Sequence, residues 1–249
     1  MDLKGCAAIV TGGNGGLGRR IGRALALQGV HVAAVYAQSK EATEEVARDL
    51  SALGPRAVAI QADVTDPAQV ARMVEQTQKE FGRVDILVNN GAFNKWVPFP
   101  DLDALTLDLW EHILKTNLTG PFNCIKAVAP VMRAQKRGRI LNIASIAGLN
   151  PSGSSIAYAV SKAGLIHLTR CMAVALAPHV TVNCIAPGFM EGTRMTANLD
   201  PEYRARAADL NALKRPADKD DIANQIVAFA QSDTTTGQTL VIDSGRIFH

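Results

Sequence analysis

The stretch TGGNGGLG, residues 11–18, places five glycines in eight positions, directly after the apolar run of residues 6–10. Glycines at the end of a strand and the start of a helix let backbone N–H groups approach a diphosphate, while the helix directs its positive end at the anion. Counted on Gly12, Gly16 and Gly18, the spacing is Gly-x-x-x-Gly-x-Gly, one residue longer than the common dinucleotide fingerprint. We therefore predict a phosphate-binding turn here; a merely flexible loop is the alternative.

Around this turn, short apolar runs alternate with longer amphipathic ones. The runs are apolar on both faces, which is typical of parallel strands covered by helices on two sides. The predicted strands are 6–12, 30–36, 57–63, 85–90, 139–145, 180–186 and 238–243, and the predicted helices are 16–28, 41–53, 67–81, 106–136, 155–177 and 219–231. Strict alternation predicts the α/β class: a single-domain, doubly wound Rossmann fold with a seven-stranded, mainly parallel sheet flanked by helices.

The organisation of the chain favours one domain over residues 1–249, because no linker, repeat or low-complexity segment divides it. Residues 188–217 interrupt the alternation, and a loop of that length is often a functional lid. We expect this segment to contact the substrate.

Composition narrows the class of protein. A net charge of +3 with dispersed basic residues does not indicate nucleic-acid binding, and the four cysteines form no Cys-x-x-Cys pair that would indicate a zinc site or a disulfide framework. We predict no metal site. The chain begins without a signal-like segment and has no apolar run of the roughly 18 residues that a membrane span needs. A cytoplasmic protein is therefore expected.

The end of the second predicted strand is where the adenosine ribose of a dinucleotide arrives. An acidic residue there would bind the 2′-hydroxyl of NAD, but Tyr36 occupies the position, followed by Ser39 and Lys40. The missing acid and the nearby cation favour NADP(H), with NAD(H) as the alternative. Lys40 is equally well explained as the solvated start of a helix.

Tyr158 and Lys162 are four residues apart in SSIAYAVSKAG, residues 154–164, and share one face of the predicted helix. A nearby ammonium lowers the pKa of a tyrosine toward the range where acid–base catalysis works best. Ser145 ends the fifth predicted strand at the same edge of the sheet, where its hydroxyl could hold a carbonyl oxygen. The alternative is an ordinary helix face with a lysine that reaches solvent.

The sequence resembles the short-chain dehydrogenase/reductase family over essentially its whole length. It is most similar to 3-oxoacyl-reductase-like and glucose-dehydrogenase-like members of about 250 residues. The matching motifs are TGGNGGLG, ADV at 62–64, NNGA at 89–92, NLTG at 117–120, Ser145, YAVSK at 158–162, APG at 186–188 and TGQTLVID at 236–243.

The resemblance implies a role for each matching position. Tyr158 is expected to be the general acid/base, Lys162 to lower its pKa and bind the nicotinamide ribose, and Ser145 to orient the substrate oxygen. Asn117 would complete a catalytic tetrad by holding a water that links Lys162 to solvent. The expected cofactor contacts are Gly12, Asn14, Gly16, Leu17, Gly18, Tyr36, Ser39, Lys40, Asp63, Val64, Asn90, Gly91, Ala92, Tyr158, Lys162, Pro187, Gly188 and Thr193.

Some positions depart from the family pattern. Gly15 stands where NADP-preferring relatives often carry a basic residue, which weakens the prediction of NADP(H). The threonine expected five positions after Pro187 is replaced by Gly192, and Thr193 follows it. Glu191 and Arg194 add charges that are either lid surface or substrate contacts.

Together these features predict an NAD(P)-dependent oxidoreductase that interconverts a small-molecule secondary alcohol and a ketone. One alternative is a non-catalytic dinucleotide sensor of the same fold. Another is a 3-oxoacyl-thioester reductase, for which the basic stretch 133–139 could help to dock an acidic carrier protein. The resemblance also implies a homotetramer or homodimer built on the helices predicted at 106–136 and 155–177.

Overall fold

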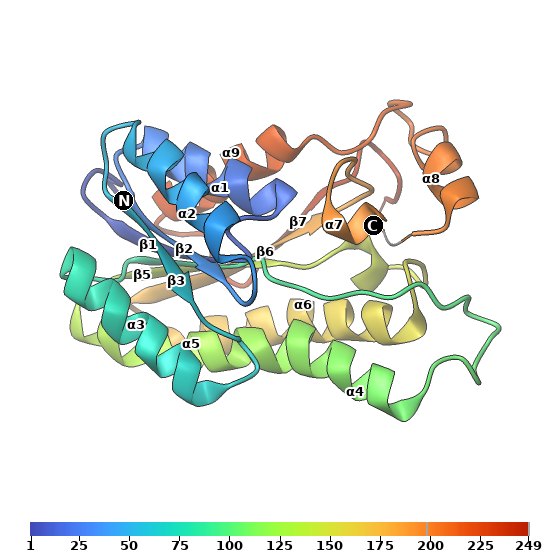
Figure 1. Cartoon of the computed structure of the whole chain (residues 1–249), viewed down its shortest axis with the longest axis horizontal. Helices are drawn as coiled ribbons and strands as arrows, with labels where there is room; N and C mark the ends of the chain where they lie inside the picture. Colours follow the sequence, from blue (N-terminus) through green and yellow to red (C-terminus); the bar gives the residue numbers. More distant parts are fainter. Residues whose placement is uncertain (198, 249) are drawn as a thin grey trace.

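A twisted sheet in which all paired strands run parallel forms the centre of the molecule (Figure 1). The computed structural model describes residues 1–197 and 199–248. The strand order is β3-β2-β1-β4-β5-β6-β7. The strands are β1 (Ala7–Thr11), β2 (His31–Tyr36), β3 (Ala57–Gln61), β4 (Ile86–Asn89), β5 (Gly138–Ile143), β6 (Val180–Pro187) and β7 (Thr239–Ile242).

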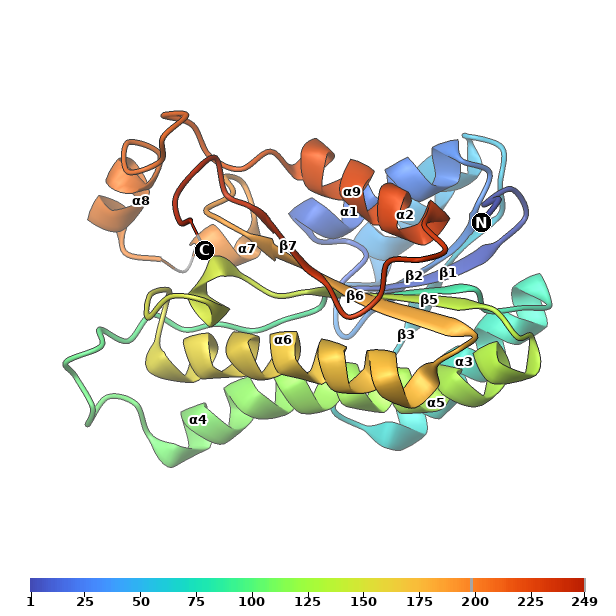
Figure 2. The same ribbon diagram turned by 180° about the vertical axis from the view of Figure 1, so that it is seen from behind.

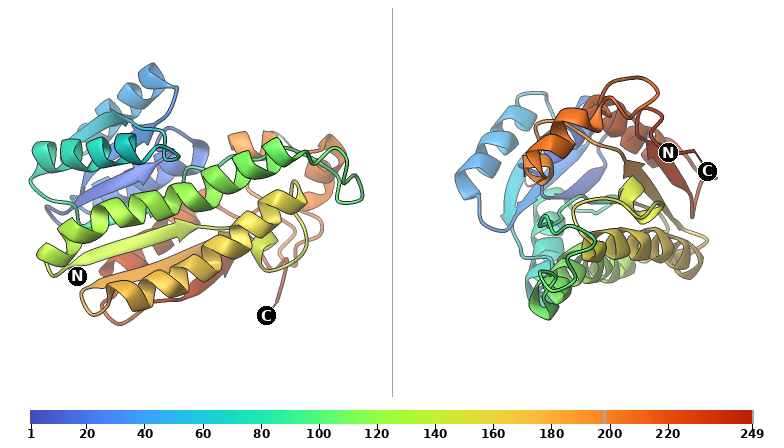
Figure 3. Two further views of the ribbon diagram at one scale, coloured as in Figure 1. Left: turned by 90° about the horizontal axis from the view of Figure 1, so that it is seen from below. Right: turned by 90° about the vertical axis from the view of Figure 1, so that its right-hand side faces the viewer.

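Helices cover both faces of this sheet (Figures 1 and 2). On one face lie α1, α2 and α9, and on the other lie α3, α5 and α6, with α5 and α6 side by side (Figure 3). The helical segments are α1 (Gly16–Leu27), α2 (Lys40–Ser51), α3 (Pro67–Phe81), α4 (Leu107–Leu114), the π-helical η1 (Lys115–Thr119), α5 (Gly120–Ala134), the 3₁₀ turn η2 (Ile146–Gly148), α6 (Ile156–Leu176), α7 (Arg194–Ala197), α8 (Pro201–Ala207) and α9 (Lys219–Gln231).

The strands are apolar throughout because each is buried on two sides. In β1, Ala8 and Val10 belong to the apolar cluster under α1 and α9, whereas Ile9 between them belongs to the cluster under α3 and α5. Successive side chains of a strand point to opposite faces, so a strand between two helical layers needs an apolar residue at every position. The prediction of a doubly wound Rossmann sheet is confirmed, and all of the described pairing is parallel.

The predicted strand boundaries lie within two residues of the observed ones, and so do most helix boundaries. The prediction of one helix over 106–136 is wrong in detail: α4 and α5 are joined by η1, where the backbone widens into a π-helix. The prediction of irregular structure over 188–217 is also wrong in part, since α7 and α8 lie within it; residue 198 of that range lies outside the described residues. Asp200 caps α8 by accepting from Tyr203 N at 3.0 Å, with Pro201 in the first turn. An Asp-Pro pair is a common start of a helix, so the beginning of α8 could have been predicted from the sequence.

One described helix, α6, is long and apolar enough by composition to cross a membrane. In the structure it packs against β6 and α5. Its residues Leu165 and Ile166 are buried with Ala144 and Cys184 in a small apolar cluster. Packing in the core therefore accounts for part of the apolar character of α6.

At the amino ends of the strands, a buried carboxylate joins three segments. Asp85 accepts hydrogen bonds from Ala7 N at 2.9 Å, from Arg83 Nε at 2.6 Å and from Arg137 Nη2 at 3.0 Å, and its side chain is fully buried. Burial by itself raises the pKa of Asp85, but the bonds from Arg83, Ala7 and Arg137 outweigh burial and hold that pKa below its ordinary value. This carboxylate ties the start of β1 to β4 and β5.

Substitution of Asp85 by asparagine tests this tie. We expect Asp85→Asn to lower the free energy of unfolding by roughly 3 kcal/mol, because it leaves two guanidinium groups without their buried counter-charge. Urea denaturation followed by circular dichroism measures the change. Glu44→Gln is the control, since it breaks the exposed Lys40–Glu44 pair, whose side chains are 64% and 44% exposed, and should cost less than about 0.5 kcal/mol. Equal losses in the two variants would contradict a structural role for Asp85.

Candidate active site

The glycine turn between β1 and α1 has a shape that only glycine permits. Gly12 has a φ of 60°, a left-handed conformation. A Cβ at Gly18 would lie 2.2 Å from the carbonyl oxygen of Gly12, so no side chain fits there. The turn is also held from the neighbouring strand, because Asn90 Nδ2 donates to Thr11 O at 2.9 Å and to Gly12 O at 3.1 Å. The predicted phosphate turn is thus a rigid backbone cradle at the start of α1.

Two cavities meet along this turn at the carboxyl edge of the sheet. The first, of about 270 Å³, extends from the turn to Ser145, Tyr158 and Lys162. The second, of about 180 Å³, extends the other way along the end of β2. Both are lined by Gly12, Asn14, Gly91, Ala92 and Arg194.

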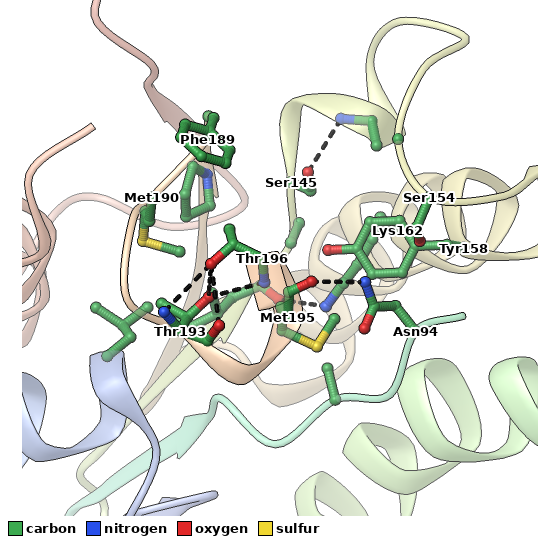
Figure 4. Close-up of a pocket in the computed structure, with 18 of the residues that line it drawn as sticks. Asn94, Ser145, Ser154, Tyr158, Lys162, Phe189, Met190, Thr193, Met195 and Thr196 are labelled. Carbon is green, nitrogen blue, oxygen red and sulfur yellow. Dashed lines mark hydrogen bonds between the residues drawn. The ribbon is translucent and has the colours of Figure 1, made fainter. Parts of the chain in front are cut away.

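Tyr158 and Ser145 face one another in the first cavity (Figure 4). Ser155 caps α6 by accepting from Tyr158 N at 3.2 Å, which places Tyr158 in the first turn of that helix. Ser145 follows β5 and accepts from Ala147 N at 3.1 Å. The Ser145 side chain also lies close enough to Tyr158 to lower the pKa of its hydroxyl. The structure therefore brings the two predicted catalytic hydroxyls together.

Lys162 lies one turn further along α6 and is buried. Its Nζ donates to Ile143 O at 2.8 Å, at the end of β5, and lies 5.7 Å from the centre of the Tyr158 ring. Burial lowers the pKa of Lys162 to about 8. The prediction that Tyr158 and Lys162 lie on the same face of the helix is thus confirmed.

The expected lowering of the Tyr158 pKa by Lys162 is not found in the protein alone. Burial raises the pKa of Tyr158 to about 12, and the opposing contribution comes from the hydrogen bond with Ser145. A buried phenolate loses its hydration, and this cost exceeds what one hydrogen bond returns. Tyr158 is therefore protonated at neutral pH and is a proton donor in this state.

Asn117 lies in the π-helical segment η1 and is fully buried. Its Oδ1 accepts from Phe93 N at 2.8 Å, and its Nδ2 donates to Phe93 O at 2.8 Å and to Ser161 Oγ at 3.2 Å. Both Nδ2 hydrogens and one acceptor site of Oδ1 are therefore used within the protein. The side chain itself fixes the loop after β4 against α6.

The loop after β6 forms the opposite wall of the first cavity. Pro187, Gly188 and Thr193 line the cavity as predicted, whereas Gly192 does not. Thr193 and Thr196 bond each other reciprocally, with Thr196 N donating to Thr193 Oγ1 at 3.2 Å and Thr193 N donating to Thr196 Oγ1 at 3.2 Å. Of the two candidate positions, Thr193 therefore lies at the cavity, one residue later than the family spacing.

The second cavity contains most of the residues predicted for the adenosine end. Tyr36, Ser39, Asp63 and Val64 line it. Lys40 is not among its lining residues; its Nζ lies 3.8 Å from Glu44 on the exposed side of α2. No carboxylate from the end of β2 enters this cavity within the described chain.

Sequence reasoning missed several lining residues of the first cavity. Ser154 has a buried hydroxyl without a hydrogen-bond partner among the described residues, and Asn94 Nδ2 donates to Met195 O at 2.9 Å across the cavity. Phe189, Met190, Tyr203 and Arg246 also line it. No sequence motif contains these residues. The one feature of the sequence that could have indicated them is that each lies in a segment that follows the end of a strand.

The site as built fits a dinucleotide. The glycine cradle lies between the two cavities, at the helix start where a diphosphate binds. The cavities extend from it in opposite directions, as the two nucleotide halves of such a molecule do, and an unpartnered buried hydroxyl, that of Ser154, remains for a polar group of a ligand. The chemistry available is proton donation by Tyr158 beside a hydrogen-bonding serine.

Known proteins share this arrangement. The family model for short chain dehydrogenases matches residues 6–204. A 3-oxoacyl-(acyl-carrier-protein) reductase of Staphylococcus epidermidis is 38% identical over 247 residues, covering 96% of this chain and 98% of that protein. One from Synechocystis is 37% identical over 244 residues, covering 96% of each.

Solved structures agree with the sequence comparisons. A short-chain type dehydrogenase/reductase from Mycobacterium marinum superposes with a TM-score of 0.91 at 33% identity, covering 98% of this chain and 96% of that one. Neither comparison supports a non-catalytic sensor. The chain belongs to the short-chain dehydrogenase family and is an NAD(P)-dependent oxidoreductase.

Proposed function

We propose that the protein interconverts a ketone and a secondary alcohol with Tyr158 as its general acid/base and NADP(H) as its preferred cofactor. One observation carries the proposal: Tyr158 and Ser145 lie together in a cavity that continues to the glycine cradle (Figure 4). A proton donor at that place is needed for carbonyl reduction and not for dinucleotide binding.

In this proposal the nicotinamide, when bound, supplies or accepts the hydride. Ser145 and Tyr158 both donate hydrogen bonds to the substrate oxygen, and Tyr158 transfers its proton as negative charge develops there. A high pKa does not prevent this transfer, because an alkoxide is a stronger base than a phenolate. Lys162 stabilises the resulting phenolate by its positive charge, and Ser154 is available to orient the substrate.

The preference for NADP(H) rests on the second cavity. Its wall at the end of β2 consists of Tyr36, Ala37, Gln38 and Ser39, which are uncharged, whereas a 2′-hydroxyl-specific site would carry a carboxylate there.

The names of the relatives favour a 3-oxoacyl thioester as the ketone. The basic stretch 133–139, considered for docking a carrier protein, is poorly placed for that purpose. Arg137 and Arg139 lie at the amino end of β5, bonded to Asp85 and Asp233, whereas the first cavity opens at the carboxyl end. Docking would have to use cations at the cavity itself.

We also propose a cytoplasmic, single-domain protein that assembles as a homotetramer or homodimer. The assembly would use α5 and α6, which lie side by side on one surface (Figure 3). Phe122, Val160 and Val174 on these helices are 39%, 43% and 82% exposed, which supports burial by a second copy.

Tyr158→Phe is expected to abolish turnover and to leave cofactor binding nearly intact, because it removes the donated proton and keeps the ring. We expect kcat for acetoacetyl-CoA or another accepted ketone to fall by at least about a thousandfold, measured by nicotinamide absorbance. Binding of NADPH, followed by fluorescence, is the control. Wild-type turnover in this variant would overturn the proposed role of Tyr158.

Ala37→Asp is expected to reverse the cofactor preference, because it places a carboxylate in the wall of the second cavity. The Kd for NADPH should rise about tenfold or more through repulsion of the 2′-phosphate, with little change for NADH. Isothermal titration of both cofactors measures the change. Ala37→Asn, similar in shape but uncharged, separates charge from bulk; equal effects on NADH and NADPH would contradict the assignment.

Lys162→Met is expected to change how stability depends on pH. The folded-state pKa of Lys162 is about 8, below the ordinary 10.5, so between these values the unfolded chain binds more protons and stability rises with pH. The wild-type free energy of unfolding should gain roughly 2 kcal/mol from this group between pH 7.5 and 9.5.

Urea denaturation at both pH values tests this expectation. Lys162→Met should lack the gain, and Lys126→Met, on the exposed side of α5, should retain it. An identical rise in wild type and Lys162→Met would show that Lys162 is not a buried cation.

A further inference from the structure

Arg194 occupies a position that no other charged residue shares. It is the one charged residue of the described chain that lines both cavities. The other residues common to both are Gly12, Asn14, Gly91 and Ala92, which form the floor at the ends of β1 and β4. Arg194 comes from α7, in the loop after β6, and therefore faces this floor from the opposite wall.

The backbone that carries Arg194 is anchored on every side. Lys219 Nζ donates to Glu191 O at 2.7 Å. Asn94 Nδ2 donates to Met195 O at 2.9 Å, as Figure 4 shows. Thr193 and Thr196, which lie on either side of Arg194 in the sequence, hydrogen-bond each other in both directions.

The glycine turn contributes directly to this anchoring. A Cβ at Gly16 would lie 2.7 Å from Gly192 O, so the absence of a side chain at Gly16 is what lets the loop after β6 approach the start of α1. The glycine turn and the segment that holds Arg194 are thus in direct contact.

The guanidinium of Arg194 has no counter-charge. Within the described residues it makes no hydrogen bond or ion pair, whereas Arg83, Arg137 and Arg139 each pair with an aspartate. The first cavity has no Asp or Glu in its described lining, and the second has only Asp63. A fixed backbone therefore presents an unpaired cation at the junction of two cavities that hold almost no negative charge.

We infer that Arg194 binds the diphosphate of the dinucleotide, from the side opposite the glycine turn. This inference rests on the proposed use of a dinucleotide. The diphosphate joins the two nucleotide halves and so belongs where the two cavities meet. Backbone N–H groups and the start of α1 face it from one side, and a guanidinium supplies paired donors and full charge from the other. Arg194 then links cofactor binding to the loop that forms the substrate wall.

The test is Arg194→Gln, which keeps a polar side chain and removes the charge. Isothermal titration of the protein would use NADH, NADPH, ADP-ribose and adenosine 2′-monophosphate. We expect the Kd for NADH, NADPH and ADP-ribose to rise about tenfold together, because all three carry the diphosphate. Adenosine 2′-monophosphate carries the 2′-phosphate alone and should bind unchanged. Arg194→Lys should be intermediate.

Arg204→Gln is the matched control, since Arg204 is exposed on α8 and lines neither cavity; its affinities should equal those of wild type. A loss for NADPH and adenosine 2′-monophosphate alone would instead assign Arg194 to the 2′-phosphate. Unchanged affinities with a raised KM for the ketone would assign it to the substrate. Either result overturns the inference. A wild-type protein that binds none of these ligands would refute the proposed cofactor itself, which keeps the two failures distinct.

Discussion

Parallel pairing of β1 with both β2 and β4 is the constraint on which the site depends. Because successive strands are added outward in both directions from β1, the connections that leave β1 and β4 run to opposite faces and open a crevice between them. The glycine turn follows β1, and residues 90–92 follow β4. Asn90 and Thr11 bond these two strand ends to each other, so the sheet itself sets the floor of both cavities.

Buried charge at the amino edge of the sheet has partners within the fold, whereas polar groups at the carboxyl edge lack them. At the amino edge, Asp85 is surrounded by donors and its pKa is held low, so burial there is compensated within the fold. At the carboxyl edge, the buried Ser154 hydroxyl and the exposed Arg194 guanidinium have no partners among the described residues. The unpartnered buried hydroxyl costs stability in the free protein, and a ligand that bonds it recovers that cost. The exposed guanidinium remains available to an anionic ligand.

Much of the fold could be predicted because local and tertiary preferences agree. Helix α3 is predicted with its observed ends, since Asp66 caps it, Pro67 opens it and Gly82 ends it with a φ of 77°. The break at η1 could not be predicted in this way. In η1, Asn117 forms hydrogen bonds with Phe93, which is 24 residues away in the sequence. No local sequence pattern near Asn117 predicts these bonds.

The sequence by itself determined the order of the elements, the glycine cradle and the identity of the residues at the strand ends, because periodicity and steric freedom are local properties. Only the tertiary structure decided how those residues behave. It buries Tyr158 so that its pKa rises instead of falling, it places Thr193 rather than Gly192 in the cavity wall, and it sets Arg194 across from the glycine turn. Burial and charge at a site depend on groups far apart in the chain, and these meet only when the sheet has formed.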